Sequence, residues 1–224
     1  MRILIIAATP FEILPLRQYL DKYCQSKTND SYEQGELVVQ ILVTGVGQML
    51  TAFALGSVLS KTSFDLLINA GVAGTFDRNL PLGTVVQVVS EQFGDLGAED
   101  QDGSFLDIHS MGLIDANAAP FQTGQLINTA SAKFDFLPSV SGLTVNKVHG
   151  YEPSIEQITS KYPVQVESME GAAFFYAALV SETPFLQIRA ISNYVEARNR
   201  ANWELGLAID NLNEVLVEIL KSFV

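Results

Sequence analysis

The stretch RILIIAATPFE, residues 2–12, decides the fold more than any other part of the sequence. Its first seven residues form a continuous run rich in branched apolar side chains, which is typical of a parallel strand covered on both faces. Pro10 then ends the strand, and apolar residues recur at helical spacing from Phe11 to about Cys24. Glu12 therefore lies just past the carboxyl end of the first strand, where open α/β sheets bind their ligands.

The alternation of strand and helix patterns continues along the chain. Residues 91–123 differ, because they are acidic and glycine-rich, and we expect a long surface excursion there. No linker or repeat interrupts the sequence, so we expect a single domain over residues 1–224. This domain would be an α/β three-layer sandwich, with helices on both sides of a central mixed, mostly parallel sheet. The predicted strands lie at residues 2–8, 37–43, 65–70, 84–90, 142–146, 163–167 and 185–191, and the predicted helices at 11–24, 48–59, 124–132, 153–159, 170–180 and 203–222.

Composition limits the partners that the chain can have. The 224 residues include 13 Lys and Arg against 25 Asp and Glu, a net charge of −12, which argues against a nucleic-acid or anionic membrane partner. One cysteine, Cys24, allows no internal disulfide, and two histidines, His109 and His149, cannot form a histidine-rich metal site. We expect no metal and no organic cofactor. The apolar runs are too short for a secretory signal or a membrane span, so we expect a cytoplasmic protein.

Common ligand-binding and catalytic motifs do not occur in the sequence. The dinucleotide fingerprint, the P-loop, the hydrolase elbow and the zincin motif all fail. What remains are two glycine turns after strands, at residues 45–47 and 71–74, and three polar residues at strand or helix ends: Glu12, Glu170 and Asn193. Each has a purely structural explanation, since glycines turn chains, a glutamate favours a helix start and an asparagine favours a turn.

Taken together and in order, these segments resemble the purine nucleoside phosphorylase and nucleosidase superfamily. The matching stretches run from the first strand to the start of the last helix and therefore cover most of the chain. The strings VESMEGAAFFYA (166–177), PFLQIRAISNYVEARNRANW (184–203) and FGDLGAED (93–100) are similar to the futalosine hydrolases of menaquinone biosynthesis. The resemblance implies a nucleoside phosphorylase-like fold. It also implies hydrolysis of the N-glycosidic bond of futalosine, which releases hypoxanthine and dehypoxanthine futalosine.

The resemblance also implies roles for individual residues. Glu12 would activate the attacking water, and Glu170 would accept hydrogen bonds from the ribose 2′ and 3′ hydroxyls. Met169 would pack its thioether against the sugar. Asn193 would contact the leaving base. The remaining substrate contacts expected from the resemblance are Val72, Gly74, Val148, His149 and, for a carboxylated 5′ extension, Arg198 or Arg200 with Trp203 or Phe11 as an apolar wall.

Asn193 is the most informative of these residues. It occupies the position that carries aspartate in the adenine-specific nucleosidases that this sequence resembles. An ionised aspartate only accepts hydrogen bonds, whereas an amide both accepts and donates, so Asn193 can accept from N7–H and donate to a 6-oxo oxygen. The residue therefore indicates a 6-oxopurine leaving group. Its amide cannot supply a proton by ionising, and the sequence does not identify the group that does.

Water is the nucleophile that the sequence favours. Phosphorylases of this type carry G-D-P-x-R after the first strand and an arginine before the second glycine turn, because phosphate needs fixed cations. The corresponding stretches here, Ala8–Phe11 and Leu67–Asn69, contain no arginine. Another purine nucleosidase or phosphorylase and a non-catalytic nucleoside-binding module remain alternatives. The resemblance also implies a homo-oligomer, a dimer or larger, in which a neighbouring subunit lends a residue to the site.

Overall fold

The computed structural model describes residues 1–28, 30–129 and 136–224. Its centre is a parallel group of strands in which β1 (Arg2–Ala7) lies between β4 (Leu37–Val43) and β5 (Leu66–Thr75). The strand β13 (Phe185–Tyr194) runs parallel to β5 along the other edge of β5. Nearly every residue of β1 and of the first part of β5 and β13 is buried, as expected for strands covered on both faces.

The sheet closes on itself beyond β5, which the sequence analysis did not predict. The strand β13 pairs with β5 and also, antiparallel, with β6 (Val85–Phe93). From β6 the pairing continues through β11 (Ser139–Thr144) and β12 (Val166–Ser168) and returns to β5. These five strands therefore form a closed ring, and a closed ring has no free edge along its pairings.

Short strands extend the sheet at its two ends. The hairpin of β2 (Gln25–Thr28) and β3 (Ser31–Gln34) is added antiparallel to β4, and β10 (Gln125–Ile127) with β9 (Phe121–Gln122) is added antiparallel to β6. A separate hairpin joins β7 (Gly97–Glu99) to β8 (Phe105–Asp107). The expected mixed sheet is confirmed, although these additions give antiparallel pairs a larger share than expected.

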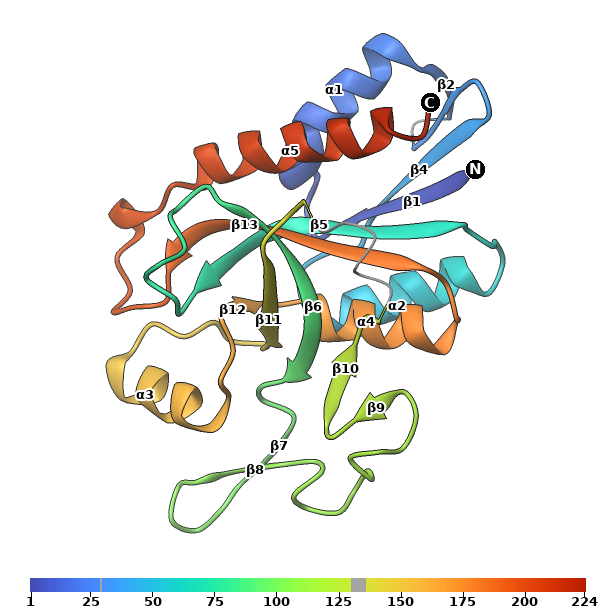
Figure 1. Cartoon of the computed structure of the whole chain (residues 1–224). Helices are drawn as coiled ribbons and strands as arrows, with labels where there is room; N and C mark the ends of the chain where they lie inside the picture. Colours follow the sequence, from blue (N-terminus) through green and yellow to red (C-terminus); the bar gives the residue numbers. More distant parts are fainter. Residues whose placement is uncertain (29, 130–135) are drawn as a thin grey trace.

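Helices cover both faces of the sheet, so the three-layer arrangement is confirmed (Figure 1). The helices α1 (Leu14–Tyr23) and α5 (Leu205–Lys221) pack on one face, and α2 (Gln48–Leu59) and α4 (Gly171–Val180) pack on the other. Side chains of β1 alternate between two apolar clusters, with Ile3 and Ile5 facing α1 and α5, and Leu4 and Ile6 facing α2 and α4. The helix α3 (Glu152–Lys161) packs on a third, smaller cluster beyond the end of β11.

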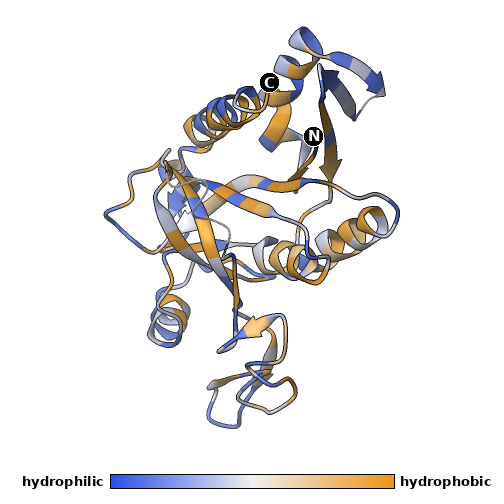
Figure 2. Cartoon of the chain, turned by 45° about the vertical axis from the view of Figure 1, so that its right-hand side comes forward, coloured by the Kyte–Doolittle hydropathy of each residue, from blue (hydrophilic) through white to orange (hydrophobic). Residues whose placement is uncertain are grey.

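The helices of the two layers differ in their outer surfaces. The helix α5 has a hydrophilic outer face and an apolar inner face, whereas α2 and α4 carry few hydrophilic residues on any side (Figure 2). An apolar helix in a globular protein is normally covered on more than one side. The outer face of α2 and α4 is therefore a candidate contact surface. Nowhere in the described ranges is a helix long and apolar enough to cross a membrane.

The predicted helix over 124–132 is wrong where the structure describes it. Residues 125–127 form β10, and residues 130–132 of the prediction lie outside the described residues. Thr123 and Gly124 both adopt positive φ, 49° and 79°, which makes a sharp turn and reverses the chain into an antiparallel strand. Burial of Leu126 against the apolar cluster under α4 then fixes this strand in place.

The expected surface excursion at 91–123 is only partly correct. Its first residues, 91–93, complete β6, and Glu91 is fully buried. The hairpin of β7 and β8 follows as a protruding element (Figure 1). A run of acidic residues thus indicated a solvated segment, but the sheet continues into its first three positions.

Candidate active site

A cavity of about 400 Å³ opens at the carboxyl ends of β1, β5 and β13, next to the start of α4. The ends of parallel strands meet there, as the sequence analysis predicted for Glu12. The closure of the sheet adds the end of β12 to the same wall. Eight of the nine predicted site residues line this cavity: Glu12, Val72, Gly74, Val148, Met169, Glu170, Asn193 and Arg198.

Glu12 is buried in the short helix η1 (Pro10–Ile13) that follows β1. Its carboxylate accepts hydrogen bonds from the Thr9 N–H (2.9 Å), the Thr9 hydroxyl (3.0 Å) and the Val72 N–H (3.2 Å). Gly71 lies against the same carboxylate, where an added Cβ would stand 2.8 Å from Glu12 Oε1. The carboxylate is therefore held in one orientation, and only glycine at position 71 leaves room for it.

Glu170 is the residue before α4, and its carboxylate reaches the turn before α2. The Gly47 N–H donates to Glu170 Oε1 over 2.9 Å. Burial is the main cause that raises the pKa of Glu170, while the positive charge of Arg189 and the Gly47 N–H act against it. Met169 precedes Glu170 and lines the same wall of the cavity. A polar acceptor beside a thioether suits a ribose, whose hydroxyls donate and whose carbons are apolar.

Asn193 reaches the cavity because β13 contains an irregularity. Ile191 pairs with Ala73 and Asn193 with Gly74, so Ser192 is an extra residue that shifts the register of the ladder. The Ser192 hydroxyl donates to Asn193 Oδ1 over 2.9 Å, and Asn193 Nδ2 donates to the carbonyl of Tyr194 over 3.0 Å. One amide hydrogen and one lone pair of the amide oxygen are then still available to a ligand.

His149 does not line the cavity, although its neighbour Val148 does. The ring of His149 contacts the carboxylate of Glu167 through Nδ1, and its backbone N–H donates to Glu167 Oε1 over 2.9 Å. Glu167 is buried in β12 and itself lines the cavity. His149 thus contacts Glu167, a cavity-lining residue that the sequence did not single out, and its contact with a base stays a prediction.

Arg198 lies at the rim of the cavity and stacks on Trp203. Its guanidinium carbon lies 5.2 Å from the centroid of the Trp203 ring, and both residues line the cavity. Arg200 also stacks on Trp203, at 5.6 Å, but does not line it. No carboxylate of the described residues forms an ion pair with Arg198. Phe11, the other expected wall residue, is exposed and lines the cavity.

Asp95 fixes a loop instead of lining the cavity. Its carboxylate accepts hydrogen bonds from the Asn146 N–H (2.5 Å) and from Asn146 Nδ2 (3.1 Å). The loop that follows β11 is thereby attached to the loop that follows β6. The interpretation of the FGDLG string as a turn agrees with this geometry.

Arg189 is a buried cation that the sequence analysis missed. It lies on β13, is 1% exposed and donates through Nη1 to the carbonyls of Ile188 (3.1 Å) and Asn69 (3.5 Å). Its charge acts on the pKa of Glu170 and of Glu91, which places it among the acidic groups behind the cavity. A charged residue within the apolar strand FLQIRAIS was the available signal, because arginine is rarely buried without acidic neighbours.

Metal ligands do not gather in the part of the chain that the structure describes: no group of three His, Cys, Asp or Glu side chains could hold an ion there. The chemistry of the cavity is that of carboxylates, one amide and a rim guanidinium. Such groups can activate water, hold hydroxyls and bind a polar ring.

Comparisons with known proteins identify the family. The profile of the Phosphorylase superfamily matches residues 2–224. A futalosine hydrolase from Streptomyces coelicolor is 30% identical over 192 residues, which is 82% of this chain and 80% of that protein. A 5′-methylthioadenosine/S-adenosylhomocysteine nucleosidase from Maridesulfovibrio salexigens is 32% identical over 242 residues, which covers 99% of this chain and all of that protein.

Solved structures share the fold. A methylthioadenosine/S-adenosylhomocysteine nucleosidase from S. pneumoniae with a transition-state inhibitor superimposes with a TM-score of 0.80, at 24% identity and full coverage of both chains. Futalosine hydrolase of Helicobacter pylori gives a TM-score of 0.79 at 12% identity, with 99% of this chain and 98% of that chain covered. The chain therefore belongs to the phosphorylase superfamily, and within it to the N-glycosidases that include the methylthioadenosine/S-adenosylhomocysteine nucleosidases and the futalosine hydrolases.

Proposed function

We propose that the chain is a futalosine hydrolase, which cleaves the N-glycosidic bond of futalosine with water and releases hypoxanthine for menaquinone biosynthesis. One observation carries this proposal. The same cavity holds an amide, Asn193, and a guanidinium without an ion-pair partner among the described residues, Arg198. The amide suits a 6-oxopurine, and the guanidinium suits a carboxylate at the far end of the nucleoside.

The proposed reaction passes through a sugar cation that resembles an oxocarbenium ion. Glu12 accepts a proton from the attacking water as the C–O bond forms at the anomeric carbon and the C–N bond breaks. Glu170 accepts hydrogen bonds from the 2′ and 3′ hydroxyls and stabilises the positive charge of the ring. The bond electrons pass to the purine, which takes a proton at N7 from solvent or from a group other than Asn193, because the Asn193 amide does not ionise.

Recognition of the base follows from the free positions on Asn193. Its oxygen accepts from N7–H, and its second amide hydrogen is donated to the 6-oxo oxygen. A 6-amino group would instead bring its own N–H donor against the N–H donor of the Asn193 amide, so that neither donor has an acceptor. An unmatched pair of donors in a partly buried site is costly, so the amide disfavours adenine. Gly74 contributes by its lack of a side chain, since an added Cβ would stand 3.1 Å from Asn193 Nδ2.

Recognition of the 5′ extension rests on Arg198. Arg198 is the Lys or Arg side chain that lines the cavity, and no carboxylate of the described residues forms an ion pair with it. Glu196, the nearby acid that could have neutralised Arg198, instead pairs with Arg78 at 2.7 Å. A carboxylated aromatic group would meet the guanidinium of Arg198 and the ring of Trp203 together.

Methylthioadenosine hydrolysis is the second candidate, and one observation favours it. The cavity is also lined by the apolar side chains of Phe11, Val46 and Leu205, which would accommodate a methylthio group. A nucleosidase relative matches this chain along nearly its whole length. This candidate predicts release of adenine, whereas Asn193 favours release of hypoxanthine.

The deciding experiment incubates the pure protein with futalosine, inosine and methylthioadenosine in parallel, with and without phosphate, and follows the free base by chromatography. Hypoxanthine from futalosine alone, independent of phosphate, is the expected result. The Arg198→Ala variant should raise KM for futalosine, while Arg2→Ala, which changes an exposed arginine at the amino end of β1 that does not line the cavity, should leave it unchanged. Adenine release from methylthioadenosine, or a phosphate requirement, would overturn the proposal.

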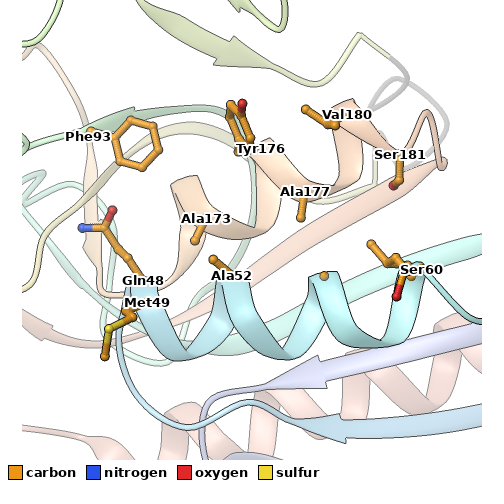
Figure 3. Close-up of a pocket in the computed structure, with 12 residues that line it drawn as sticks. Gln48, Met49, Ala52, Ser60, Phe93, Ala173, Tyr176, Ala177, Val180 and Ser181 are labelled. Atoms are coloured by element: carbon orange, nitrogen blue, oxygen red, sulfur yellow. The ribbon is translucent and has the colours of Figure 1, made fainter.

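We also propose that two copies of the chain associate through the outer face of α2 and α4. These helices contain no charged residue, and they pack side by side around an open apolar groove of about 640 Å³. Ala52 of α2 and Ala173 and Ala177 of α4 point into the space between the helices, and larger side chains stand around it (Figure 3). Met49 and Phe53 on α2 are each 77% exposed.

A second copy is the occupant that fits this surface. In a dimer with a two-fold axis, each chain uses the same surface, so that surface must be complementary to itself. The large exposed side chains of α2 on one chain could fill the groove lined by alanines on the other chain. Two chains of net charge −12 repel each other least through a face that carries no charge. The surface also continues into the site, because Val46 lines the catalytic cavity and Gln48 and Met49 line the groove.

Sedimentation velocity tests this assembly. The wild-type chain should sediment as a dimer or larger, and Ala52→Glu should sediment as a monomer because it places a carboxylate in the groove. The matched control Leu113→Glu changes an exposed leucine on the excursion and should leave the assembly unchanged. A monomeric wild type, or equal behaviour of the two variants, would refute the proposal.

A further inference from the structure

A buried polar network lies behind the active site, and the reaction chemistry does not use it. Glu91, on β6, is 1% exposed and accepts hydrogen bonds from Gln187 Nε2 (2.6 Å) and from the Thr144 hydroxyl (2.9 Å). Gln187 in turn accepts from Asn69 Nδ2 over 3.1 Å. The network therefore joins strands β6, β11, β13 and β5 inside the closed part of the sheet.

The network ends on the first turn of α4. The Ala172 N–H donates to Thr144 Oγ1 over 2.7 Å, and the Gly171 N–H donates to Ser168 Oγ over 3.3 Å. The first backbone N–H groups of a helix have no partner within the helix and need one from outside. The residue at the N-cap position, Glu170, does not supply it, because its side chain accepts the Gly47 N–H instead.

We propose that Glu91 is a positioning residue for Glu170. By accepting the Thr144 hydroxyl, Glu91 orients the Thr144 oxygen towards the Ala172 N–H, so that Thr144 caps α4 in place of Glu170. The carboxylate of Glu170 is then free to face the cavity instead of folding back onto its own helix. The role of Glu170 on the ribose rests on the proposed function, whereas the capping arrangement does not.

Two glycines show that this part of the chain is built around Glu91. A Cβ added to Gly171 would overlap Glu91 Oε1, and a Cβ added to Gly142 would stand 2.5 Å from it. Neither glycine has the positive φ that would require glycine for the backbone alone. Both positions therefore lack a side chain because the buried carboxylate occupies that space.

The ionised form of Glu91 is the form that satisfies the network. An ionised carboxylate accepts from the Gln187 amide and the Thr144 hydroxyl together, whereas a protonated one must donate its own hydrogen and loses one of these bonds. The pKa of Glu91 is raised to about 7, chiefly by burial and to a smaller extent by the charge of Glu170, while Thr144, Arg189 and Gln187 act against the rise. The arrangement of Glu170 should thus tighten as the pH rises through neutrality.

The first test measures hydrogen exchange of the Ala172 amide and needs no activity. Thr144→Val, which keeps the shape but removes the hydroxyl, should raise the exchange rate about tenfold, and Glu91→Gln should raise it as well. Thr144→Ser should restore the wild-type rate. Ser141→Ala is the matched control, because Ser141 lies on the same strand as Thr144 but its hydroxyl donates to Gln165. This variant should leave the exchange rate unchanged. Unchanged exchange in Thr144→Val and Glu91→Gln would overturn the proposal.

The second test compares futalosine with its 2′-deoxy analogue. A misplaced Glu170 loses its contact with the 2′ hydroxyl, so Glu91→Gln should lower kcat/KM for futalosine about tenfold and change that for the deoxy analogue little. In the wild type this preference should rise between pH 6 and pH 8, and in Glu91→Gln it should stay constant. Equal losses on both substrates would show a merely structural role. A wild type that cleaves neither substrate would refute the proposed function, and the exchange test would still decide the role of Glu91.

Discussion

The Gly47 N–H donates to the carboxylate of Glu170 over 2.9 Å, which joins the turn before α2 to the residue before α4. The two segments are far apart in the sequence, and both helices belong to the apolar face described above. A contact between chains on that face would therefore act on the turn that holds the carboxylate of Glu170, the proposed ribose contact. This relationship connects assembly with catalysis in the proposed enzyme.

Replacement of Glu170 should remove most of the activity. In Glu170→Ala the ribose hydroxyls lose a charged acceptor, and such hydrogen bonds contribute about 1.5–3 kcal/mol each. We expect kcat/KM to fall about a hundredfold or more, measured by hypoxanthine release, with an unchanged circular dichroism spectrum. Glu156→Ala is the control, because it removes an exposed glutamate of α3 that does not line the cavity. Near-normal turnover of Glu170→Ala would contradict the assigned role.

Replacement of Glu12 should affect the chemical step. Glu12→Gln keeps the size of the side chain but removes the group that accepts the proton of water. General base catalysis contributes about 10²–10⁴-fold, and kcat should fall within that range while KM changes little. Single-turnover kinetics with saturating enzyme separates the two effects. A Glu12→Gln enzyme that keeps its kcat would exclude Glu12 as the base.

Exchange of the amide for a carboxylate should change the preferred base. Asn193→Asp loses the donor for a 6-oxo oxygen and gains an acceptor for a 6-amino group. We expect the ratio of kcat/KM for inosine-type to adenosine-type substrates to fall about tenfold or more. Competition between paired substrates in one reaction measures the ratio directly. A constant ratio would refute the hydrogen-bond argument for the leaving group.

A methyl group at position 71 should disturb Glu12 without touching the substrate. Gly71→Ala brings a Cβ within 2.8 Å of Glu12 Oε1, so the carboxylate must move. Overpacking of this kind costs about 1–3 kcal/mol, and we expect both a lower Tm and a lower kcat. The matched control is Gly206→Ala in α5, where nothing lies within 4 Å of the added carbon and Tm should not fall. Equal effects of the two variants would contradict the crowding at Gly71.

Stability should fall as the pH rises, with Glu91 as a main cause. Its pKa is raised from 4.5 to about 7 in the folded chain, so between these values the folded state holds a proton that the unfolded state has lost. The free energy of unfolding then decreases with pH across this window, by an amount on the order of 3 kcal/mol, and levels off above it. Urea unfolding at pH 5 and pH 8 should show a larger loss for the wild type than for Glu91→Gln. Equal losses would mean that Glu91 does not titrate in this window.

The sequence predicted the strands with continuous apolar runs and the residues at their carboxyl ends. Glu12 and Asn193 come from segments far apart in the sequence, yet they line one cavity because β1 and β13 both run parallel to β5 and their carboxyl ends meet. Glu170 lines the same cavity for another reason, since it follows β12, which runs antiparallel to β5 and reaches the site through the closure of the sheet. Hydrophobic patterning is a local signal, and these strands carry it clearly. The three-layer arrangement was predictable for the same reason.

The closure of the sheet and the buried polar groups were not predictable in this way. Pairing of β13 with β6 as well as β5 is a long-range choice that no local pattern encodes. Glu91 was grouped with the acidic segment, because its burial depends on Gln187 and Thr144 from other strands. The helix predicted near Gly124 failed because positive φ at two successive residues outweighed helical spacing.

The extra residue in β13 has a consequence for how this site could diversify. Ser192 shifts the register of the ladder by one residue. The residues before it pack in the core, and Asn193 after it lines the cavity. Substitution at Asn193 changes the ligand contact while the core pairing stays in place. Deletion of Ser192 would turn the side chains that follow it to the opposite face of the strand. Asn193 would then point away from the cavity, and the buried side chain of Val195 would lose its place in the core. Exchange of residue 193 therefore alters the ligand contact alone, whereas a change in the length of the strand would reverse its two faces.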